Sequence, residues 1–407
     1  MEVRFGRITL RCFILLLWML TPLAARATDP LPAEGGTPEP APADTALIAA
    51  DTLPRRGFFN KIMAYFEGSN QDRTFERKMD FSILPGPHYS SDIGFGLGMV
   101  ASGLFRIDRA DSITPVSNVS LVGDIATSGF WMLGIRGNTF FNKGDFRLDY
   151  KISYNTTPEA TYWGRGYDMG RRDENESEFR RKEIAVNLDF MWRFARNLYV
   201  GAGADFNHFN SKELDTSLLG DMDRETVTSA GPGAFFMYDS RDCITAPYRG
   251  WLVKAESSVY PKALGNKRRF SRTELTVDFY HSLWKDAILA YDLHGMYNDG
   301  SHVPWTMLAQ AGGSSRMRGY YEGRYRDRGI VEFQAELRQR IWRRIGAVAW
   351  VGAANVFPSF GRFDIDHTLP DYGAGLRWEF KKRVNVRLDF GFGKEGNAII
   401  FNINEAF

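Results

Sequence analysis

From about Asp80 to the end of the chain, apolar and polar residues alternate one by one. Residues 145–155 show the pattern with aromatic and branched side chains, namely Phe146, Leu148, Tyr150, Ile152 and Tyr154. A period of two places apolar side chains on one face of a β-strand and polar side chains on the other. Long strands of this kind, separated by turn residues, are typical of a transmembrane β-barrel.

The alternating segments predict about sixteen strands, an even number as in single-chain bacterial barrels. We expect the first strand at residues 91–107 and the last at residues 397–407. A soluble β-sandwich would also alternate. The barrel is favoured because the apolar faces are rich in aromatic residues and the polar faces carry arginines and carboxylates in comparable numbers, as a lipid-facing surface and a wet, charge-paired lumen require. We therefore predict an all-β fold, a transmembrane antiparallel β-barrel over residues 80–407.

The residues before the barrel fall into three segments. Residues 1–27 resemble a secretory signal peptide, because arginines precede an apolar run that is too short to span a bilayer and residues 25–27 fit a cleavage site. Residues 28–54 are rich in proline, so we expect a disordered linker. Residues 55–79 form a short amphipathic periplasmic segment. It is either a connector turn packed against the barrel or a helix on the membrane or in the lumen.

Composition removes several classes of function. Lys+Arg is 51 and Asp+Glu is 49, a net charge of +2, so the chain shows no sign of nucleic-acid binding. The six histidines are scattered, and Cys243 is the sole cysteine outside the signal peptide, so we expect no metal site and no cofactor. No G-x-S-x-G nucleophile elbow is present, and we expect no catalytic residue. An outer-membrane lipid hydrolase with a serine and a histidine on the barrel wall remains an alternative.

The segment 312–324 combines glycines with arginines and tyrosines. Taken alone, it could be a solvated hairpin loop. It lies between strands expected at 304–312 and 327–342, the eleventh and twelfth in order. Because odd strands run outward when the N-terminus is periplasmic, the segment belongs on the extracellular side.

Gly312, Gly313, Arg318, Gly319 and Tyr320 together resemble the loop motif of the bacterial surface-antigen barrels, the BamA/TamA-like outer-membrane assembly-factor superfamily. Two other motifs agree in order and spacing. They are a structural hairpin with Asp239, Arg241, Asp242, Pro247 and Gly250, and a C-terminal strand signal with Phe401 and Phe407.

The resemblance implies that the loop folds into the lumen and that Arg318 pairs with carboxylates on the inner wall of strands twelve and thirteen. Glu336 matches the acidic residue of strand twelve, and it falls on the polar face of that strand. On strand thirteen, Gly352 stands where the family has an aspartate. We therefore expect either that Arg318 relies on Glu336 and Glu332 or that the loop is anchored more loosely than in the family at large.

The resemblance also implies a location and a function. We expect a monomer in the bacterial outer membrane that contacts outer-membrane lipid, with periplasmic or outer-membrane proteins as candidate partners. Assembly factors of this superfamily carry periplasmic POTRA modules, and none fits in the segment of about fifty residues before the barrel. A glycine-rich first strand at 91–107 would weaken its pairing with the last strand. The expected function is insertion or translocation of protein or lipid through that lateral seam, and a passive pore or structural barrel is the alternative.

Overall fold

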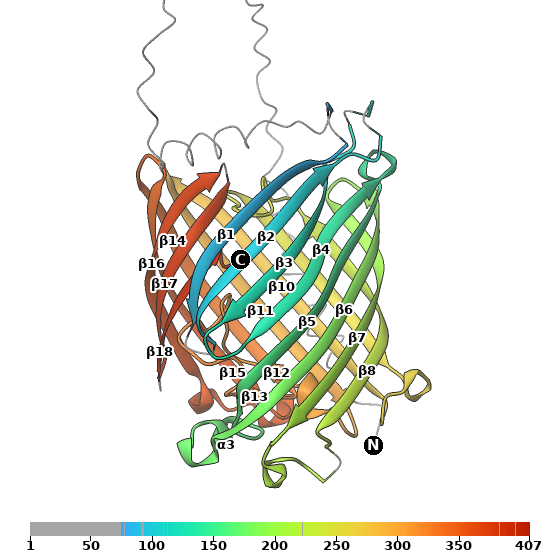
Figure 1. Cartoon of the computed structure of the whole chain (residues 1–407), viewed down its shortest axis with the longest axis vertical. Coiled ribbons are helices and arrows are strands. Elements are labelled where there is room, and N and C mark those ends of the chain that lie inside the picture. Colours follow the sequence, from blue (N-terminus) through green and yellow to red (C-terminus); the bar gives the residue numbers. More distant parts are fainter. Residues whose placement is uncertain are drawn as a thin grey trace, which may run out of the picture. The chain divides into compact units, whose positions relative to one another are not determined.

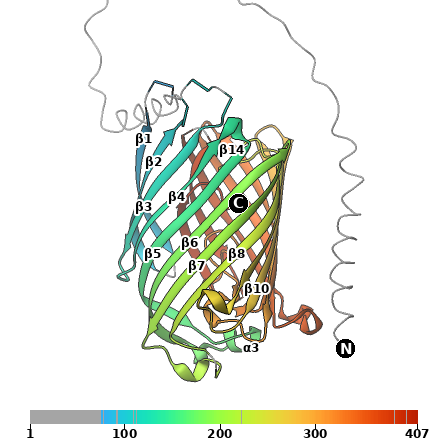
Figure 2. The ribbon, with the colours of Figure 1, turned by 90° about the vertical axis from the view of Figure 1, so that its right-hand side faces the viewer.

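The computed structural model describes residues 75–76, 78–90, 93–108, 110–111, 113–221, 223–381, 383–394 and 396–407. The expected signal peptide, linker and most of the segment 55–79 lie outside the described residues. The described chain forms one antiparallel sheet of 16 strands that follow one another in sequence order (Figure 1). The strands are tilted, and the sheet curls around a central lumen in both side views (Figures 1 and 2).

The strands of the sheet are β1 (Asp80–Ser90), β2 (Gly94–Phe105), β3 (Ser117–Ala126), β4 (Trp131–Phe141), β5 (Phe146–Tyr162), β6 (Ser177–Ala195), β7 (Leu198–Lys212), β8 (Thr226–Asp239), β9 (Gly250–Tyr260), β10 (Phe270–Trp284), β11 (Ala287–Gly300), β14 (Gly329–Trp342), β15 (Ile345–Phe357), β16 (Leu369–Lys381), β17 (Val384–Phe392) and β18 (Asn397–Ile403). A separate pair is formed by β12 (Ala309–Gln310) and β13 (Arg326–Asp327). The helices are short: α3 (Tyr167–Gly170), η2 (Asn142–Gly144), η3 (Asp173–Asn175), η4 (Thr216–Leu218), η5 (Lys262–Leu264), η6 (Trp305–Met307), η7 (Phe360–Arg362) and η8 (Ile365–His367).

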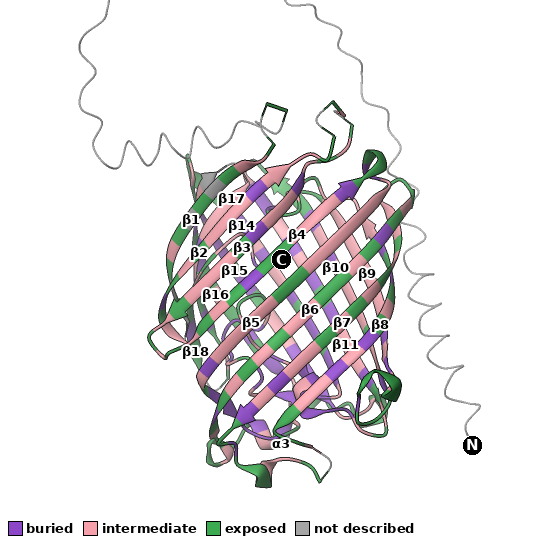
Figure 3. Ribbon diagram, turned by 45° about the vertical axis from the view of Figure 1, so that its right-hand side comes forward, coloured by how far each residue is buried: buried purple, intermediate pink, exposed green. Residues whose placement is uncertain are grey.

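The alternation of the sequence becomes an outer and an inner wall. On β14, Val331 and Phe333 are exposed on the outside, whereas Gln334 and Glu336 are buried inside. Exposed and less exposed residues alternate along the strands (Figure 3). No helix among the described residues has both the length and the apolar content to cross a bilayer. The curled antiparallel sheet of 16 strands confirms the predicted all-β barrel fold.

One expected strand is wrong and one strand was missed, so the two errors cancel in the count. The chain forms an additional strand, β1, before the expected first strand. Its Pro85 and Pro87 argue against a central strand, but an edge strand tolerates proline. Residues 304–312, expected as strand eleven, form η6 and the two-residue β12 instead. The true eleventh strand is β11, so with a periplasmic N-terminus the loop that follows it is still expected on the extracellular side.

The two ends of the sheet, β1 and β18, lie against each other, but among the described residues no backbone hydrogen-bond ladder joins them. They are in contact, and a Cβ added at Gly86 of β1 would lie 4.0 Å from the Phe401 ring of β18. Among the strand pairings of the described residues, the sheet order runs from β1 to β18 and no hydrogen-bonded pairing joins the two. The seam thus involves β1, rather than the glycine-rich β2 that was expected there.

The connection between β11 and β14, residues 301–328, is here called the lumen loop. Its first part fills the extracellular end of the barrel, where Trp305 packs against Tyr162, Phe179 and Phe209 at ring-centroid distances of 4.9, 5.7 and 5.1 Å. Its second part contains the glycine, arginine and tyrosine motif. The fold therefore places this motif inside the barrel.

Candidate functional site

The lumen loop turns back on itself at two glycines. Gly312 and Gly313 have φ of 105° and 111°, which residues with a side chain rarely adopt. A Cβ at Gly312 would lie 2.6 Å from the carbonyl oxygen of Tyr321, so there is no room for one. The Tyr320 N–H donates to the carbonyl of Met317 at 3.0 Å and closes a turn around Arg318. The loop thereby presents Arg318 at its tip.

Arg318 is fully buried against the inner wall. Its Nη2 donates to Oε2 of Glu336 at 2.6 Å, and its Nη1 donates to Oδ2 of Asp389 at 2.9 Å. The guanidinium carbon lies 3.6 Å from the ring centroid of Trp350, within the range of a cation–π contact. Charged hydrogen bonds in a buried site are stronger than neutral ones. Arg318 therefore fixes the loop to β14, β15 and β17 at once.

Arg318 belongs to a larger ion-pair cluster at the inner wall. The cluster holds four arginines, Arg318, Arg338, Arg377 and Arg387, and three carboxylates, Glu336, Asp389 and Glu405. All of them are almost completely removed from solvent. Because each carboxylate contacts more than one arginine, no carboxylate depends on a single partner.

The aspartate expected at Gly352 has its counterpart on the next strand. In the ladder between β15 and β16, Gly352 lies directly opposite Asp371. Asp371 accepts hydrogen bonds from the backbone N–H of Gly319 at 2.8 Å and from the Trp350 indole at 2.9 Å. Sequence reasoning missed Asp371 and Asp389 as partners of the loop. The available signal was the polar-face position of Asp389 within its alternating strand.

The backbone of the loop lies directly on β17. A Cβ at Gly319 would lie 2.3 Å from the carbonyl carbon of Phe392, and one at Gly391 would lie 2.6 Å from that of Arg318. Glycine is thus required on both sides of the contact. The Tyr320 hydroxyl donates to the carbonyl of Pro370 at 2.7 Å and accepts from the Lys394 N–H at 2.9 Å. The motif is therefore held against the barrel wall through its backbone as well as through its side chains.

Glu332, the other expected partner of Arg318, contacts a different residue. It lies opposite His294 in the ladder between β11 and β14. Its carboxylate is 2.8 Å from Nδ1 of His294, whose Nε2 is 3.0 Å from Glu274. The expectation was wrong because the cross-strand neighbour reaches Glu332, whereas Arg318 points toward Glu336 and Asp389.

The hairpin motif forms a periplasmic turn between β8 and β9. Asp239 and Arg241 make two hydrogen bonds of 2.9 Å each. Asp242 accepts from the Tyr248 N–H at 2.9 Å and from Arg383 at 2.9 Å. Burial acts to raise the pKa of Asp242, but these donors outweigh it and hold the pKa below its usual value.

Two further residues of this motif shape the same turn. Pro247 is buried in it. Gly250 has φ of 111° and lies against the Ser240 carbonyl. Through Arg383, the turn is tied to the connection between β16 and β17.

The end of the chain departs from the expected terminal strand. β18 contains Phe401 but ends at Ile403, and Asn404 has φ of 71°. Phe407 then lies in the lumen, where the guanidinium of Arg338 is 5.0 Å from its ring centroid. The expectation that Phe407 closes the strand was wrong. Glu405 draws these residues inward, because its carboxylate is 2.8 Å from Nε of Arg377.

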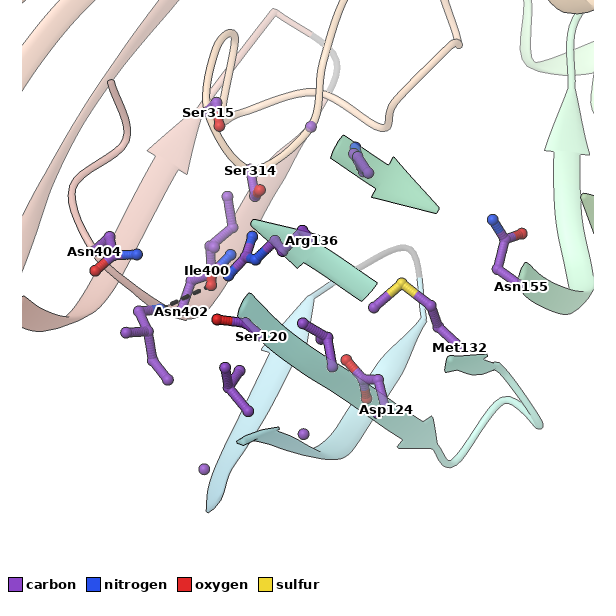
Figure 4. Close-up of a pocket in the computed structure, with 18 of the residues that line it drawn as sticks. Ser120, Asp124, Met132, Arg136, Asn155, Ser314, Ser315, Ile400, Asn402 and Asn404 are labelled. Carbon is purple, nitrogen blue, oxygen red and sulfur yellow. Dashed lines mark hydrogen bonds between the residues drawn. The ribbon is translucent and has the colours of Figure 1, made fainter. Parts of the chain in front are cut away.

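A cavity of about 1320 Å³ remains between the lumen loop and the walls formed by the first and last strands. Figure 4 shows Ser314 and Ser315 of the loop and Ser120, Asp124 and Arg136 of β3 and β4 around this space. The lining is mixed in polarity. Among the described residues, no group of three or more His, Cys, Asp or Glu side chains is arranged to hold a metal ion.

Comparisons with known proteins give one family and several similar folds. A family model described as the Omp85 superfamily domain matches residues 133–407. BamA from Haemophilus ducreyi lacking POTRA domains 1-3 superposes with a TM-score of 0.54 at 15% identity, covering 81% of this chain and 70% of that one. CdiB from Escherichia coli gives 0.56 at 12% identity, with coverages of 84% and 69%. CdiB from Acinetobacter baumannii gives a TM-score of 0.52 at 11% identity. That match covers 81% of this chain and 60% of the CdiB chain. No curated protein matches the sequence.

Proposed function

The chain belongs to the Omp85 superfamily, as a barrel of the bacterial outer membrane, and on that premise we propose that it inserts or translocates proteins or lipids through the seam between β1 and β18. BamA and CdiB share its fold. The observation that supports the proposal best is the contact of β1 with β18 without a described ladder. Backbone groups in a bilayer must be paired within the protein. A seam held by few hydrogen bonds is the easiest place for the barrel to open.

The seam can be locked with a crosslink. In a Cys243→Ser background, Gly86→Cys and Phe401→Cys place two thiols at positions that touch across it. A short bis-thiol reagent then bridges them. The protein is reconstituted into vesicles, and the folding of a small unfolded outer-membrane barrel added from outside is followed by heat-modifiable gel mobility. We expect faster folding than in empty vesicles and loss of that acceleration after crosslinking.

The control places the same crosslink where two strands are already paired. The Ser102 and Ser120 hydroxyls of β2 and β3 lie 3.0 Å apart, so Ser102→Cys with Ser120→Cys accepts the same reagent. This lock should leave the acceleration unchanged. Equal activity of the seam-locked and the unlocked protein would count against lateral opening.

We assign the lumen loop the role of ordering the lumen, with Arg318 as its anchor. Glu336 and Asp389 accept from the Arg318 side chain, and Asp371 accepts from the Gly319 N–H. The protein is proposed to act as a monomer in contact with outer-membrane lipid, together with a periplasmic or outer-membrane partner protein. Co-purification from intact outer membranes tests the partner. Recovery of the protein alone, at monomer mass, would limit the proposal to lipid.

A passive pore is the second candidate, and the cavity beside the lumen loop favours it. Planar-bilayer recordings separate the two functions. A pore conducts in the wild type, and Arg318→Ala raises its conductance because the loop no longer obstructs the lumen. Silence of both proteins would remove this candidate.

A further inference from the structure

A second cavity, of about 380 Å³, lies beneath the extracellular part of the lumen loop. Its walls come from β5 to β11 and from the loop itself. Small-molecule sites usually have volumes of about 300–1,000 Å³, so this one has the size for a compact ligand. It is separate from the anchor of Arg318, which does not line it.

Arg326 is the unusual residue of this cavity. Its side chain is 5% exposed, and it lies 4.8 and 5.8 Å from the ring centroids of Tyr162 and Trp305. Its Nε donates to the carbonyl of Gly323 at 2.8 Å. Burial lowers its pKa to about 10. Within the described part of the chain, no carboxylate forms an ion pair with it, in contrast to Arg318.

The carboxylates that line the cavity do not replace this missing partner. Glu183 is held by Arg181 and by Asn207. Asp205 accepts from Ser258 and Tyr260, each at 3.2 Å. The cavity is lined by three arginines and three carboxylates in all, the third of them the exposed Glu322. The arginines and carboxylates that line the cavity are therefore equal in number. Arg272 also lacks a carboxylate partner among the described residues, but it donates to Asn298 Oδ1 at 3.3 Å and to the Met307 carbonyl at 3.0 Å, whereas the Arg326 guanidinium donates to the Gly323 carbonyl through Nε.

Two hydroxyls add to the unmatched donors. Ser229 Oγ and Thr306 Oγ1 are buried side-chain atoms that line the same cavity, and neither has a hydrogen-bond partner among the described residues. Ser229 is 1% exposed. Buried polar groups are almost always hydrogen-bonded, so these two hydroxyls, which line the same cavity as Arg326, call for a hydrogen-bond partner. An oxyanion bound in the cavity offers an acceptor to donors of each kind.

We propose that this cavity binds a small oxyanion, a phosphate or carboxylate group, through Arg326, Ser229 and Thr306. Arginine presents a planar set of donors that matches either group. The group arrives either on a soluble metabolite or on the headgroup of an outer-leaflet lipid. The cavity volume limits the part that enters to about the size of a hexose phosphate.

The test is calorimetric titration of the full chain in detergent micelles that contain no lipopolysaccharide. Glucose 6-phosphate is the probe and glucose the neutral reference. We expect saturable binding of the phosphate and none of glucose. Arg326→Gln should weaken binding at least tenfold, and Arg326→Lys, which keeps the charge but loses the planar donors, should weaken it less. Thr306→Val keeps the shape of the side chain and should weaken binding severalfold.

The matched control is Arg324→Gln, because it removes the same charge from the same loop. Arg324 pairs with Asp173 and does not line the cavity. We expect binding within twofold of the wild type. Heat-modifiable gel mobility checks that each variant is folded, and Thr306→Val carries the test if Arg326→Gln does not fold.

The source of the oxyanion is tested by competition. Displacement of glucose 6-phosphate by added lipopolysaccharide assigns the site to a lipid headgroup, and no displacement assigns it to a soluble anion. Equal binding of glucose and glucose 6-phosphate, undiminished binding by the folded variants, or an equal loss in Arg324→Gln would overturn the proposal.

Discussion

Neutralising Glu336 should destabilise the barrel more than neutralising Arg318, although the two residues form one ion pair. The buried cluster has one more arginine than it has carboxylates. Removing Arg318 balances the charges, because Glu336 keeps Arg338 at 2.7 Å and Asp389 keeps Arg387 at 3.0 Å. Removing Glu336 increases the excess of positive charge in the cluster, because Arg318 and Arg338 both lose a carboxylate partner.

The magnitudes follow from these contacts. Arg318→Gln loses charged hydrogen bonds but strands no carboxylate, so we expect the free energy of unfolding to fall by about 2–3 kcal/mol. Glu336→Gln leaves buried arginines uncompensated, and removal of one partner of a buried pair costs about 3–5 kcal/mol. We expect a loss near the upper end of that range, because Glu336 contacts both Arg318 and Arg338 directly.

Urea titration of the folded protein, followed by tryptophan fluorescence and by heat-modifiable gel mobility, measures the difference. Arg340→Gln is the control, since its pair with Asp286 is solvent-exposed and should contribute less than about 1 kcal/mol. A larger loss for Arg318→Gln than for Glu336→Gln would refute the charge-balance argument.

Three further predictions concern the contacts around the lumen loop and the periplasmic turn. Asp371→Asn should weaken the loop anchor by about 1–3 kcal/mol, because a charged acceptor of the Gly319 N–H is lost; faster protease cleavage in the loop measures it. Gly391→Ala should displace the loop, since a Cβ there would lie 2.6 Å from the Arg318 carbonyl carbon; higher conductance or protease sensitivity than the wild type is the expected result, and an unchanged loop would contradict it. The pKa of Asp242 is lowered in the folded protein, so its stabilisation is present above the unfolded value of about 3.9 and is lost as the pH falls through the folded value. Asp242→Asn should abolish that pH dependence of urea unfolding, and a curve that keeps its shape would contradict the assignment.

The sequence predicted the walls of the barrel better than it predicted the lumen loop. Alternation assigns each residue to a face, and Glu336 was found because its face is polar. Asp389 was not assigned, because β14 and β17 are not neighbours and their inner faces meet only after the sheet curls. A pattern within one strand carries no information on which distant strand lies opposite.

The segment 304–312 shows how a period of two can mislead. Trp305 and Met307 are apolar and alternate with other residues, as in a strand, but they pack into the extracellular core with Tyr162 and Phe209. β1 was missed for the opposite reason, since its prolines suppress a strand prediction. The first error arises because burial in a core can produce the same alternation as pairing in a sheet. The second arises because an edge strand needs fewer backbone donors and so tolerates proline.

The lumen loop bonds Asp371 on β16 and Asp389 on β17, whereas the expected aspartate would lie on β15. The anchor of the loop is therefore nearer to the seam than expected. Arg318 bonds Asp389 on β17, and Asp389 also contacts Arg377. Arg377 in turn bonds Glu405, which lies two residues after the end of β18. A displacement of the last strand would therefore pull on an arginine that shares a carboxylate with the loop. Because the loop and the last strand draw on one ion-pair cluster, opening of the seam and release of the lumen loop are expected to be coupled rather than independent events.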